Sequence, residues 1–532
     1  MASSEMTTID LSAAMITQAP PLADWLVVAP LVLCMVLGAV LLMVRKDTQI
    51  QPVIAIPGLV ALVLVDAALL AHVWMNGTVT MTMGRWLPPF GISFTVDILG
   101  ALLTLTGGIA ALAGGIFGAG DVNDSGRRYG FYPFLFLMMV GVSGAFLTGD
   151  IFNLYVWFEV LLISSFGLLI LGSERGQIDG ATKYAFLNLV ATTLFLIATG
   201  YLYGIFGTLN MADIALKAQT MDDKAPMVTL VSMYLLAFGM KAAAFPANFW
   251  LPASYHTPRV VVSALFGGLL TKVGVYALIR VLLMLFPAER DLLGWVIALI
   301  AAATMVLGAM GALAQTDVRR MLGYLVISGI GVMLAGIALA SPAGVAATVF
   351  YAVHSMIVMT ALYLASGMAA RASGSFSIAE PGGLYQSHVV LAGITLALFF
   401  AVSGLPPFSG FWPKALMVKA SLDVGAWWLA AAILLTGFLT TIAVGRVWLL
   451  AYWRPAPAPP EEASLDAKAA AVTPVHALSP LLDFLPLVML TALVVLIGIF
   501  PQKLLELSQI ASEQLLNPAE YIRSVFPTGG LQ

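Results

Sequence analysis

Long apolar runs, separated by short polar segments, follow one another along most of the chain. A helix that crosses a bilayer needs about 20 mostly apolar residues. Fourteen runs are close to that length or longer: 25–44, 52–74, 95–118, 130–148, 150–171, 181–206, 227–246, 259–286, 292–314, 321–340, 344–368, 389–418, 426–453 and 481–500. Because apolar and polar residues do not alternate within them, helices are favoured over a β-barrel. The pattern predicts an all-α polytopic membrane protein with about fourteen transmembrane helices.

Basic residues are distributed unevenly between the loops. Loops after odd-numbered helices hold eleven Lys or Arg residues, and loops after even-numbered helices hold four. Short loops rich in Lys and Arg stay in the cytoplasm, so the bias predicts cytoplasmic odd loops and places both termini outside. The first residues, MASSEMTTID, lack the basic start of a cleaved signal peptide.

Two polar segments lie near the C-terminal end. The segment 454–474 reads RPAPAPPEEASLDAKAAAVTP, a composition that predicts an extended or disordered cytoplasmic linker. The segment 503–516, KLLELSQIASEQLL, has apolar residues at helical spacing. It predicts a short amphipathic helix at the membrane interface or against a partner, with an ordinary surface helix as the alternative.

Composition excludes several classes of protein. The chain is 61% hydrophobic and 10% charged, whereas soluble domains carry about 25% charged residues. The net charge is −3 without a basic block, so nucleic acid is not an expected partner. One cysteine, Cys34, cannot build a disulfide framework. The chain has no HExxH, CxxC, GxxxxGK[ST] or Rossmann glycine motif, and we expect no metal site and no cofactor.

Several runs carry an ionisable residue far from their ends. An ionised side chain at the centre of a spanning helix costs about 2.5–3.5 kcal/mol on insertion scales, so such residues are usually functional. The residues without easy access to water are Glu159, Lys241, Lys272 and Lys414. We expect these four to carry the function.

Other polar residues in the runs leave alternatives open. His354 is either part of the same chemistry or a hydrogen-bonded core residue. Lys183 lies near a helix end with Asp179 one turn earlier, and can snorkel or pair locally. For Asp66 and Asp97 we favour structural pairs or helix-end positions.

Helix breakers accompany the buried lysines. Proline follows Lys241 and precedes Lys414, and two glycines precede Lys272. Proline breaks a helix, and a broken helix at membrane depth is tolerated only beside protein or a water-filled cavity. The pattern fits transporters that are built from inverted repeats, with sites at the breaks.

Lysine and glutamate suit proton movement, because burial lowers the pKa of a lysine and raises the pKa of a glutamate. A nearby Glu159 carboxylate would hold Lys241 protonated, and loss of that charge would release the proton. Arginine stays charged, which explains lysine at each site. Tyr234 and Tyr276 lie on the helical faces of Lys241 and Lys272 and can hold ordered water.

Four blocks resemble the antiporter-like membrane subunits of respiratory complex I, membrane hydrogenases and the Mrp-type (Pha or Mnh) multi-subunit cation/proton antiporters. The blocks are DIFNLYVWFEVLLISSFGLL, GMKAAAFPANFWLPASY, ALFGGLLTKVGVYALIRV and SGLPPFSGFWPKALMVKA. Their sequences are most similar to those of the D subunits of the Mrp-type group, and the resemblance covers most of the chain.

The resemblance implies two inverted five-helix repeats with broken helices 7 and 12. The expected organisation is three N-terminal helices, the first repeat, the second repeat, a Pro/Ala-rich linker, and a last helix with the amphipathic segment: 1–128, 129–288, 289–453, 454–480 and 481–532.

The resemblance also implies roles for single residues. Glu159 matches the coupling glutamate of helix 5, Lys241 the lysine of broken helix 7, Lys272 the bridging lysine of helix 8, and Lys414 the exit lysine of helix 12. Helix 11 departs from the family, because Met359 stands where a lysine is expected one turn after the histidine. This departure puts the bridge between the halves in doubt.

We therefore expect a proton-translocating subunit of a Na+(K+)/H+ antiporter in a bacterial cytoplasmic membrane, and not an enzyme. Its expected partners are a large A-type subunit and small C-, E-, F- and G-type subunits. The alternative is a proton-pumping membrane subunit of complex I or of a membrane-bound hydrogenase. A third possibility is a structural subunit with inert buried ion pairs.

Overall fold

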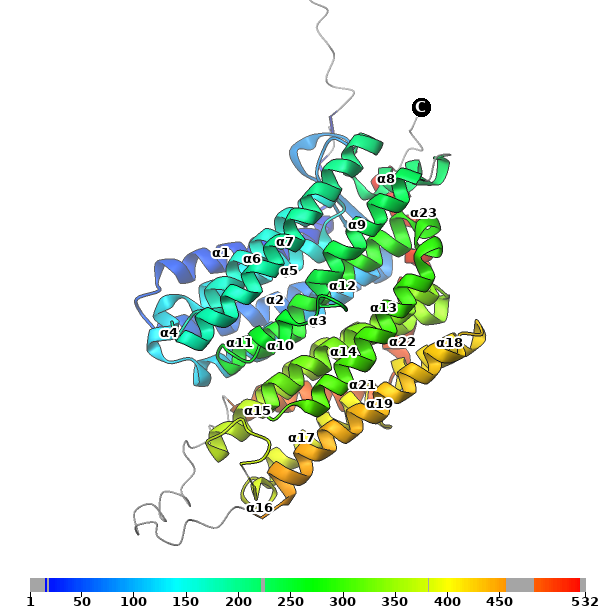
Figure 1. Cartoon of the computed structure of the whole chain (residues 1–532). Helices are drawn as coiled ribbons and strands as arrows, with labels where there is room; N and C mark the ends of the chain where they lie inside the picture. The colour runs from blue at the N-terminus through cyan, green and yellow to red at the C-terminus, as the bar shows by residue number, and fades with distance from the viewer. Residues whose placement is uncertain (1–14, 17–18, 222–224, 381, 456–482, 527–532) are drawn as a thin grey trace, which may run out of the picture.

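The structure is a computed structural model that describes residues 15–16, 19–221, 225–380, 382–455 and 483–526. Except for 454–455, the predicted linker 454–480 lies outside these residues, and so does most of the segment MASSEMTTIDLSAAM. The described chain is almost entirely helical, and its long helices run side by side (Figure 1). The expected all-α class is confirmed, apart from one small hairpin.

The first elements are η2 (Leu22–Val27), α1 (Ala29–Met43), α2 (Ile50–Asn76), β1 (Val79–Thr82), η3 (Met83–Arg85), β2 (Ser93–Val96), α3 (Ile98–Asp121) and α4 (Asp124–Tyr129). Strands β1 and β2 pair antiparallel, with Val79 opposite Val96. The next elements are α5 (Phe131–Leu147), α6 (Ile151–Leu169), α7 (Arg175–Phe206), α8 (Met211–Thr220), α9 (Ala225–Ala242), α10 (Trp250–Ser254), α11 (Val260–Leu265), η4 (Phe266–Leu270), α12 (Thr271–Ile279) and η5 (Arg280–Leu285).

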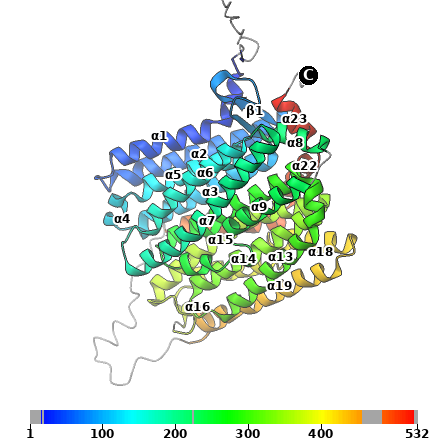
Figure 2. The ribbon, with the colours of Figure 1, turned by 45° about the horizontal axis from the view of Figure 1, so that its top comes forward.

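The second half of the chain is again helical. Its elements are α13 (Pro287–Ala314), α14 (Val318–Leu339), α15 (Pro342–Ser373), α16 (Leu384–Ser387), α17 (Val389–Ser403), α18 (Phe411–Asp423), α19 (Trp427–Val447), η6 (Trp448–Trp453), α21 (Leu485–Ile499), α22 (Gln502–Leu516) and α23 (Ala519–Val525). In both views α1, α2, α5, α6 and α7 lie on one side of the molecule, and α13, α14, α18 and α19 lie on the other (Figures 1 and 2).

Nine helices in the described ranges are long and apolar enough to cross a membrane, or ten if α21 and α22, which meet at 80°, form one span. The chain is therefore a polytopic membrane protein. Four shorter apolar helices coincide with other expected runs: α1, α5, the apolar portion of α9, and α17. Each of the fourteen expected runs contains helix, although length and composition alone support the smaller number of spans.

Two expected spans are interrupted. The helix expected over 227–246 ends at Ala242, and helix α10 begins only at Trp250. The helix expected over 389–418 ends at Ser403 and resumes at Phe411. Both gaps contain prolines, which cannot donate a backbone hydrogen bond to the preceding turn.

Helix α15 occupies the centre of the molecule. It contacts α3, α11 and η4 from the first half of the chain, and α14, α17, α18, α21 and α22 from the second. The most apolar stretches of α15 and of the span 260–285 are entirely buried inside the protein. A fully buried helix in a membrane protein has no lipid-facing side, so polar residues on any of its faces can meet other polar groups.

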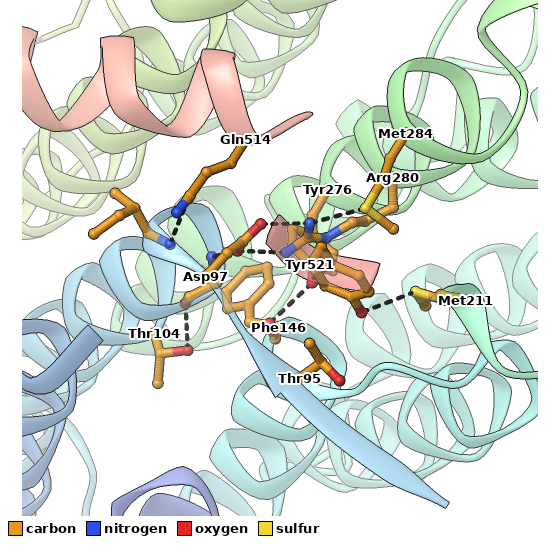
Figure 3. A network of polar contacts seen from close by, with 12 residues as sticks. Thr95, Asp97, Thr104, Phe146, Met211, Tyr276, Arg280, Met284, Gln514 and Tyr521 are labelled. Carbon is orange, nitrogen blue, oxygen red and sulfur yellow. Dashed lines mark hydrogen bonds and ion pairs between the residues drawn. The ribbon is translucent and has the colours of Figure 1, made fainter. Parts of the chain in front are cut away.

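Asp97 confirms the prediction of a structural pair at a helix end. Its side chain caps α3 through the Gly100 amide (3.0 Å), and both carboxylate oxygens accept hydrogen bonds from Arg280 at 2.6 Å. Arg280 also donates to the Tyr276 hydroxyl (3.0 Å), which in turn donates to the Phe146 carbonyl (Figure 3). This fork geometry satisfies both charges in a site that neither lipid nor water reaches.

For Asp66 the prediction of a structural pair or a helix-end position is wrong. It lies in the middle of α2 and is fully buried, and neither carboxyl oxygen has a hydrogen-bond partner in the described residues. Its side chain faces Gly108 of α3, where an added Cβ would lie 2.5 Å from Oδ2. Asp66 is therefore neither a paired group nor a helix-end group. The sequence did not reveal this, because it does not show that the residue opposite Asp66 is a glycine, Gly108.

The segment 503–516 forms α22, as predicted, and packs against its own chain. Ser512 donates to the Pro342 carbonyl at the start of α15 (2.9 Å), and the Gln514 side chain accepts from the first amide of α3 (3.2 Å). The following helix, α23, places the Tyr521 ring 5.4 Å from the Arg280 guanidinium (Figure 3). The C-terminal helices thus join the N-terminal helices to the middle of the chain.

Candidate functional site

Lys241 lies at the end of α9, next to the first helix break. Its side chain is 5% exposed, and Nζ donates to the Thr192 hydroxyl of α7 at 2.7 Å. The ammonium also lies 4.9 Å from the centre of the Phe158 ring of α6. Both partners are neutral, so the charge is held by dipoles and a ring quadrupole rather than by a contacting carboxylate.

Glu159 follows Phe158 on α6, a helix capped at its start by the Asp150 side chain, which accepts from the Asn153 amide at 2.7 Å. Glu159 is partly buried, and its Oε1 has no hydrogen-bond partner in the described residues. No ion pair within 4.0 Å joins it to Lys241 in that part of the chain, yet the two charges interact electrostatically.

A small cavity adjoins Lys241. Its volume of about 20 Å³ suffices for one water molecule. Phe158, Leu161, Leu162, Tyr184, Asn188, Lys241, Trp250 and Leu270 line it. Four of these side chains carry a polar atom, and the Trp250 indole already donates to the Met240 carbonyl at 3.0 Å. The other three, Tyr184, Asn188 and Lys241, match the number of partners that a buried water typically has. A water here would contact the lysine from a second direction, beside its bond to Thr192.

Lys272 lies just after a wide, π-helical turn. The turn η4 ends at Leu270, two residues earlier, and Lys272 donates from Nζ to the Gly267 carbonyl at 2.6 Å. The side chain is 1% exposed. An added Cβ at Gly268 would lie 3.1 Å from the Met356 carbonyl of α15. The two glycines therefore allow α15 to approach the π-turn before Lys272 closely. Such π-turns often occur at functional sites.

His354 lies on α15 and is 1% exposed. Its Nδ1 is 2.8 Å from the Ser409 hydroxyl, in the break between α17 and α18, and its Nε2 is buried without a hydrogen-bond partner in the described residues. The ring interacts electrostatically with both Lys272 and Lys414. His354 is thus a hydrogen-bonded core residue, as one interpretation predicted. Met359 is buried on the same helix.

Lys414 lies on α18, beyond the second helix break, and is 9% exposed. Nζ donates to the carbonyls of Val402 and Ser403, both at 2.9 Å. These carbonyls are free because α17 ends there and Gly404 turns the chain with φ of +86°. An unpaired helix C-terminus is a favourable place for a cation.

A cavity of about 590 Å³ adjoins Lys414 between α17, α18 and α19. Leu434 and Phe438 also line this cavity, and their side chains are 62% and 64% exposed. The cavity therefore connects Lys414 with the outer flank of the molecule. Glu159 lies on α6 on the opposite side of the molecule (Figure 1).

Lys183 stays outside this set. It pairs with Asp179 at 2.5 Å, and the two side chains are 52% and 61% exposed. The local pairing predicted for it is confirmed. The Tyr234 hydroxyl lies 3.2 Å from Thr199, and the Tyr276 hydroxyl is used by Phe146 and Arg280, so neither tyrosine bonds to a site lysine.

Sequence reasoning missed the neutral partners. Thr192, Ser409 and the carbonyls of Val402 and Ser403 were not predicted as members of the site. Asn188 and Thr192 did leave a signal, because they lie four residues apart on one face of an apolar helix. The free carbonyls left none beyond the prolines and glycines that interrupt the helices.

Comparison with known proteins gives consistent matches. Residues 148–440 match the family described as "NADH:quinone oxidoreductase/Mrp antiporter, TM". The D subunit of the Na(+)/H(+) antiporter of Alkalihalophilus pseudofirmus is 34% identical, covering 94% of this chain and 99% of its own. The protein of the same name from Bacillus subtilis is 32% identical, with coverage of 94% and 99%.

A chain in the structure of the Mrp complex from Dietzia sp. superposes with a TM-score of 0.86 and 28% identity, covering 95% of this chain and 100% of that chain. A chain of respiratory complex I from Thermus thermophilus superposes with a TM-score of 0.75 at 24% identity, covering 93% and 100%. At that identity the second likeness concerns the fold alone.

Proposed function

Because the chain belongs to the NADH:quinone oxidoreductase/Mrp antiporter family of membrane subunits, we propose that it is the proton-translocating D-type subunit of a Na+(K+)/H+ antiporter. Relatives that it matches over nearly their whole length are named as D subunits of Na(+)/H(+) antiporters. Protons would move along Glu159, Lys241, Lys272, His354 and Lys414. The chain would act as a secondary transporter rather than as an enzyme.

One observation carries this proposal: the buried lysines have no counter-ion at contact distance. In the described residues, Lys241, Lys272 and Lys414 donate only to hydroxyl or carbonyl oxygens, and no carboxylate oxygen lies within 4.0 Å of any of them. An inert structural pair would have the geometry of Arg280 and Asp97, with both charges in direct contact. Lysines held only by neutral dipoles can exchange their protons without breaking an ion pair.

The geometry supports a simple coupling step at the first pair. While Glu159 is charged, its attraction favours the ammonium form of Lys241. When Glu159 takes up a proton, that attraction disappears, and Lys241 can pass its proton to a water in the cavity beside Tyr184 and Asn188. Lysine can return to the neutral form, whereas arginine cannot.

The second half of the path would use His354. Its Nδ1 is engaged by Ser409, while Nε2 has no partner in the described residues and is free to take or give a proton. Because the ring interacts with the charges of both Lys272 and Lys414, it offers a step between them. Lys414 would then be the last residue of the path in this chain.

We further propose that the membrane spans number fourteen and that two inverted five-helix repeats, 129–288 and 289–453, follow the N-terminal segment 1–128 and precede the linker 454–480 and the last segment 481–532. Support comes from matching positions. Asp150 caps α6 and Asp317 caps α14. Gly141 and Gly308 each precede their aspartate by nine residues, and an added Cβ on either would lie 2.7 Å from a backbone nitrogen of the next helix.

We place the chain in the bacterial cytoplasmic membrane with both termini outside, as the basic loops predict. Its partners would be a large A-type subunit and small C-, E-, F- and G-type subunits. The naming of the relatives as D subunits and the match within a multi-subunit complex support this assembly. A role in complex I or a hydrogenase stays the alternative, supported by the family description, which also names NADH:quinone oxidoreductase, and by likeness of fold.

Exchange in everted membrane vesicles tests the proposal. Glu159→Ala and Lys241→Ala should each abolish the sodium-dependent collapse of a pH gradient, because each removes one titrating group from the path. The complex should still assemble, as judged by co-purification of its other subunits. Lys183→Ala is the matched control and should retain exchange. Wild-type exchange in both site variants, or a requirement of any flux for NADH, would refute the proposal.

A further inference from the structure

A second polar feature lies at one end of the helix bundle, far along the chain from the lysines. The loop between α1 and α2 and the short helix α4 surround a hollow of about 790 Å³. Arg45, Lys46, Thr48, Asp124, Ser125, Arg128 and Tyr129 line it. Both views place α4 at the margin of the bundle, where α1 ends (Figures 1 and 2).

The side chains that line this hollow carry a net positive charge. Arg45, Lys46 and Arg128 are exposed, and none of their side chains has an ion-pair or hydrogen-bond partner within the described ranges. The one acid in the lining, Asp124, lies 3.8 Å from the Arg127 guanidinium behind it. The lining thus holds three cations and one carboxylate. Asp47, beside Lys46, adds a second acid, whose Oδ1 accepts from the Gln49 and Ile50 amides, and the net charge stays positive, which makes the hollow attractive to an anion.

Hydrogen bonds fix the backbone that carries these cations. Arg127 donates from one guanidinium nitrogen to the Thr48 carbonyl at 3.5 Å and from another to the Ala119 carbonyl, and so ties the α1–α2 loop to the end of α3. The buried Gln51 donates to the Arg45 carbonyl at 2.9 Å. These bonds fix the backbone on both sides of the hollow, so a ligand would not have to order the loop on binding.

The surroundings of the hollow are apolar and exposed. Leu42 and Met43, at the end of α1, are 54% and 84% exposed, and Tyr129 is 67% exposed. In a membrane such side chains face acyl chains, with tyrosine at the level of the headgroups. A free phosphate would use only the cations, whereas a phospholipid would use both the cations and this apolar rim.

We propose that this hollow, defined by Arg45, Lys46, Ser125 and Arg128, binds the phosphate headgroup of an anionic phospholipid from the adjoining leaflet. The basic side chains would contact the phosphate oxygens, and the acyl chains would lie against α1 beside Met43. Basic pockets at the ends of transmembrane helices bind such headgroups elsewhere. The site is independent of the proton path and does not rest on the proposed transport function.

The test uses the purified antiporter complex that contains this chain, stripped of lipid in detergent. Native mass spectrometry would measure binding of phosphatidylglycerol, with phosphatidylcholine and inorganic phosphate as the other probes. The variant is R45Q/K46Q/R128Q. The control, K217Q/K419Q/K503Q, removes the same charge from α8, α18 and α22, which lie at the opposite end of the bundle from α4 (Figure 1).

Phosphatidylglycerol should bind equally well to the wild type and to the control. It should bind the hollow variant about 100-fold more weakly, because three surface cations are lost. Millimolar inorganic phosphate should not displace it. Equal binding by hollow variant and control would overturn the proposal. Displacement by inorganic phosphate would instead show a free-anion site. Loss of a partner subunit from the hollow variant would show that the cations serve a protein contact, and would equally overturn it.

Discussion

At the scale of single residues, the site depends on what the buried cations touch. Lys241 bonds to a threonine, Lys272 to a carbonyl within the π-turn, and Lys414 to two carbonyls at a helix end. Each partner is a neutral acceptor that stabilises the ammonium form without fixing it. The family relationship identifies the charged residues of the site. Their neutral contacts explain why the protons can move, since no ion pair has to break.

His354 supplies a prediction at this scale. His354→Ala should lower exchange at least tenfold, because it removes the only titrating group proposed between Lys272 and Lys414. Ser409→Ala should have a smaller effect, because it frees Nδ1 but leaves the ring in place. Sodium-driven proton uptake by proteoliposomes would measure both. If His354→Ala transported as fast as the wild type, the path would have to bypass α15.

The sequence revealed the charged residues of the site but not their partners. A lysine in an apolar run is conspicuous, because its burial is costly wherever it occurs. Thr192 and Ser409 cost little in such a run, and their role depends on which helices meet. Asp66 shows the same limit, since only the packing of α2 on Gly108 leaves it without a partner in the described residues.

At the scale of helices, glycines decide how closely neighbours pack. Gly141 of α5 faces the α6 backbone, where an added Cβ would lie 2.7 Å from the Leu161 nitrogen. Gly268 allows α15 to approach the π-turn before Lys272. The sequence predicted the helices and both breaks from apolar length and proline. It did not predict the π-turns, because a single wide turn hardly alters the apolar period.

Gly141→Ala tests the close crossing of α5 and α6. It should destabilise the protein by about 1–3 kcal/mol, because the methyl group meets backbone that cannot move aside. Gly200→Ala on α7 is the control, since nothing lies within 4 Å of an added Cβ there. That control should be neutral or gain up to about 1 kcal/mol of helix propensity. Thermal unfolding of the purified complex measures both, and equal midpoints would contradict the crossing.

At the scale of the whole molecule, buried polar contacts hold distant segments of the chain together. Asp97, at the start of α3, accepts hydrogen bonds from Arg280 of η5 (Figure 3). From the C-terminal helices, Gln514 accepts from the first amide of α3, and the Tyr521 ring lies beside the Arg280 guanidinium. Arg371, near the end of α15, pairs with Asp483 just before α21 at 2.6 Å. These pairs hold the helices that carry the site lysines in a fixed arrangement.

Asp97→Ala should therefore cost about 3–5 kcal/mol of stability, because it leaves the Arg280 charge buried and unpaired. The double variant Asp97→Leu/Arg280→Met should recover most of that loss. Asp179→Ala, which breaks an exposed pair, should cost less than about 1 kcal/mol. Denaturation midpoints of the complex would rank the variants. Equal midpoints for Asp97→Ala and Asp179→Ala would show that the buried pair does not hold the frame.

The central claim is that protons pass through lysines that can give them up. The most direct test replaces Lys241 by arginine, which keeps the positive charge and the hydrogen-bond donors but cannot release a proton. Sodium-driven proton uptake by proteoliposomes that contain the complex should fall at least 100-fold in Lys241→Arg, and should be unchanged in Lys183→Arg. Uptake by Lys241→Arg at the rate of Lys183→Arg would contradict the account.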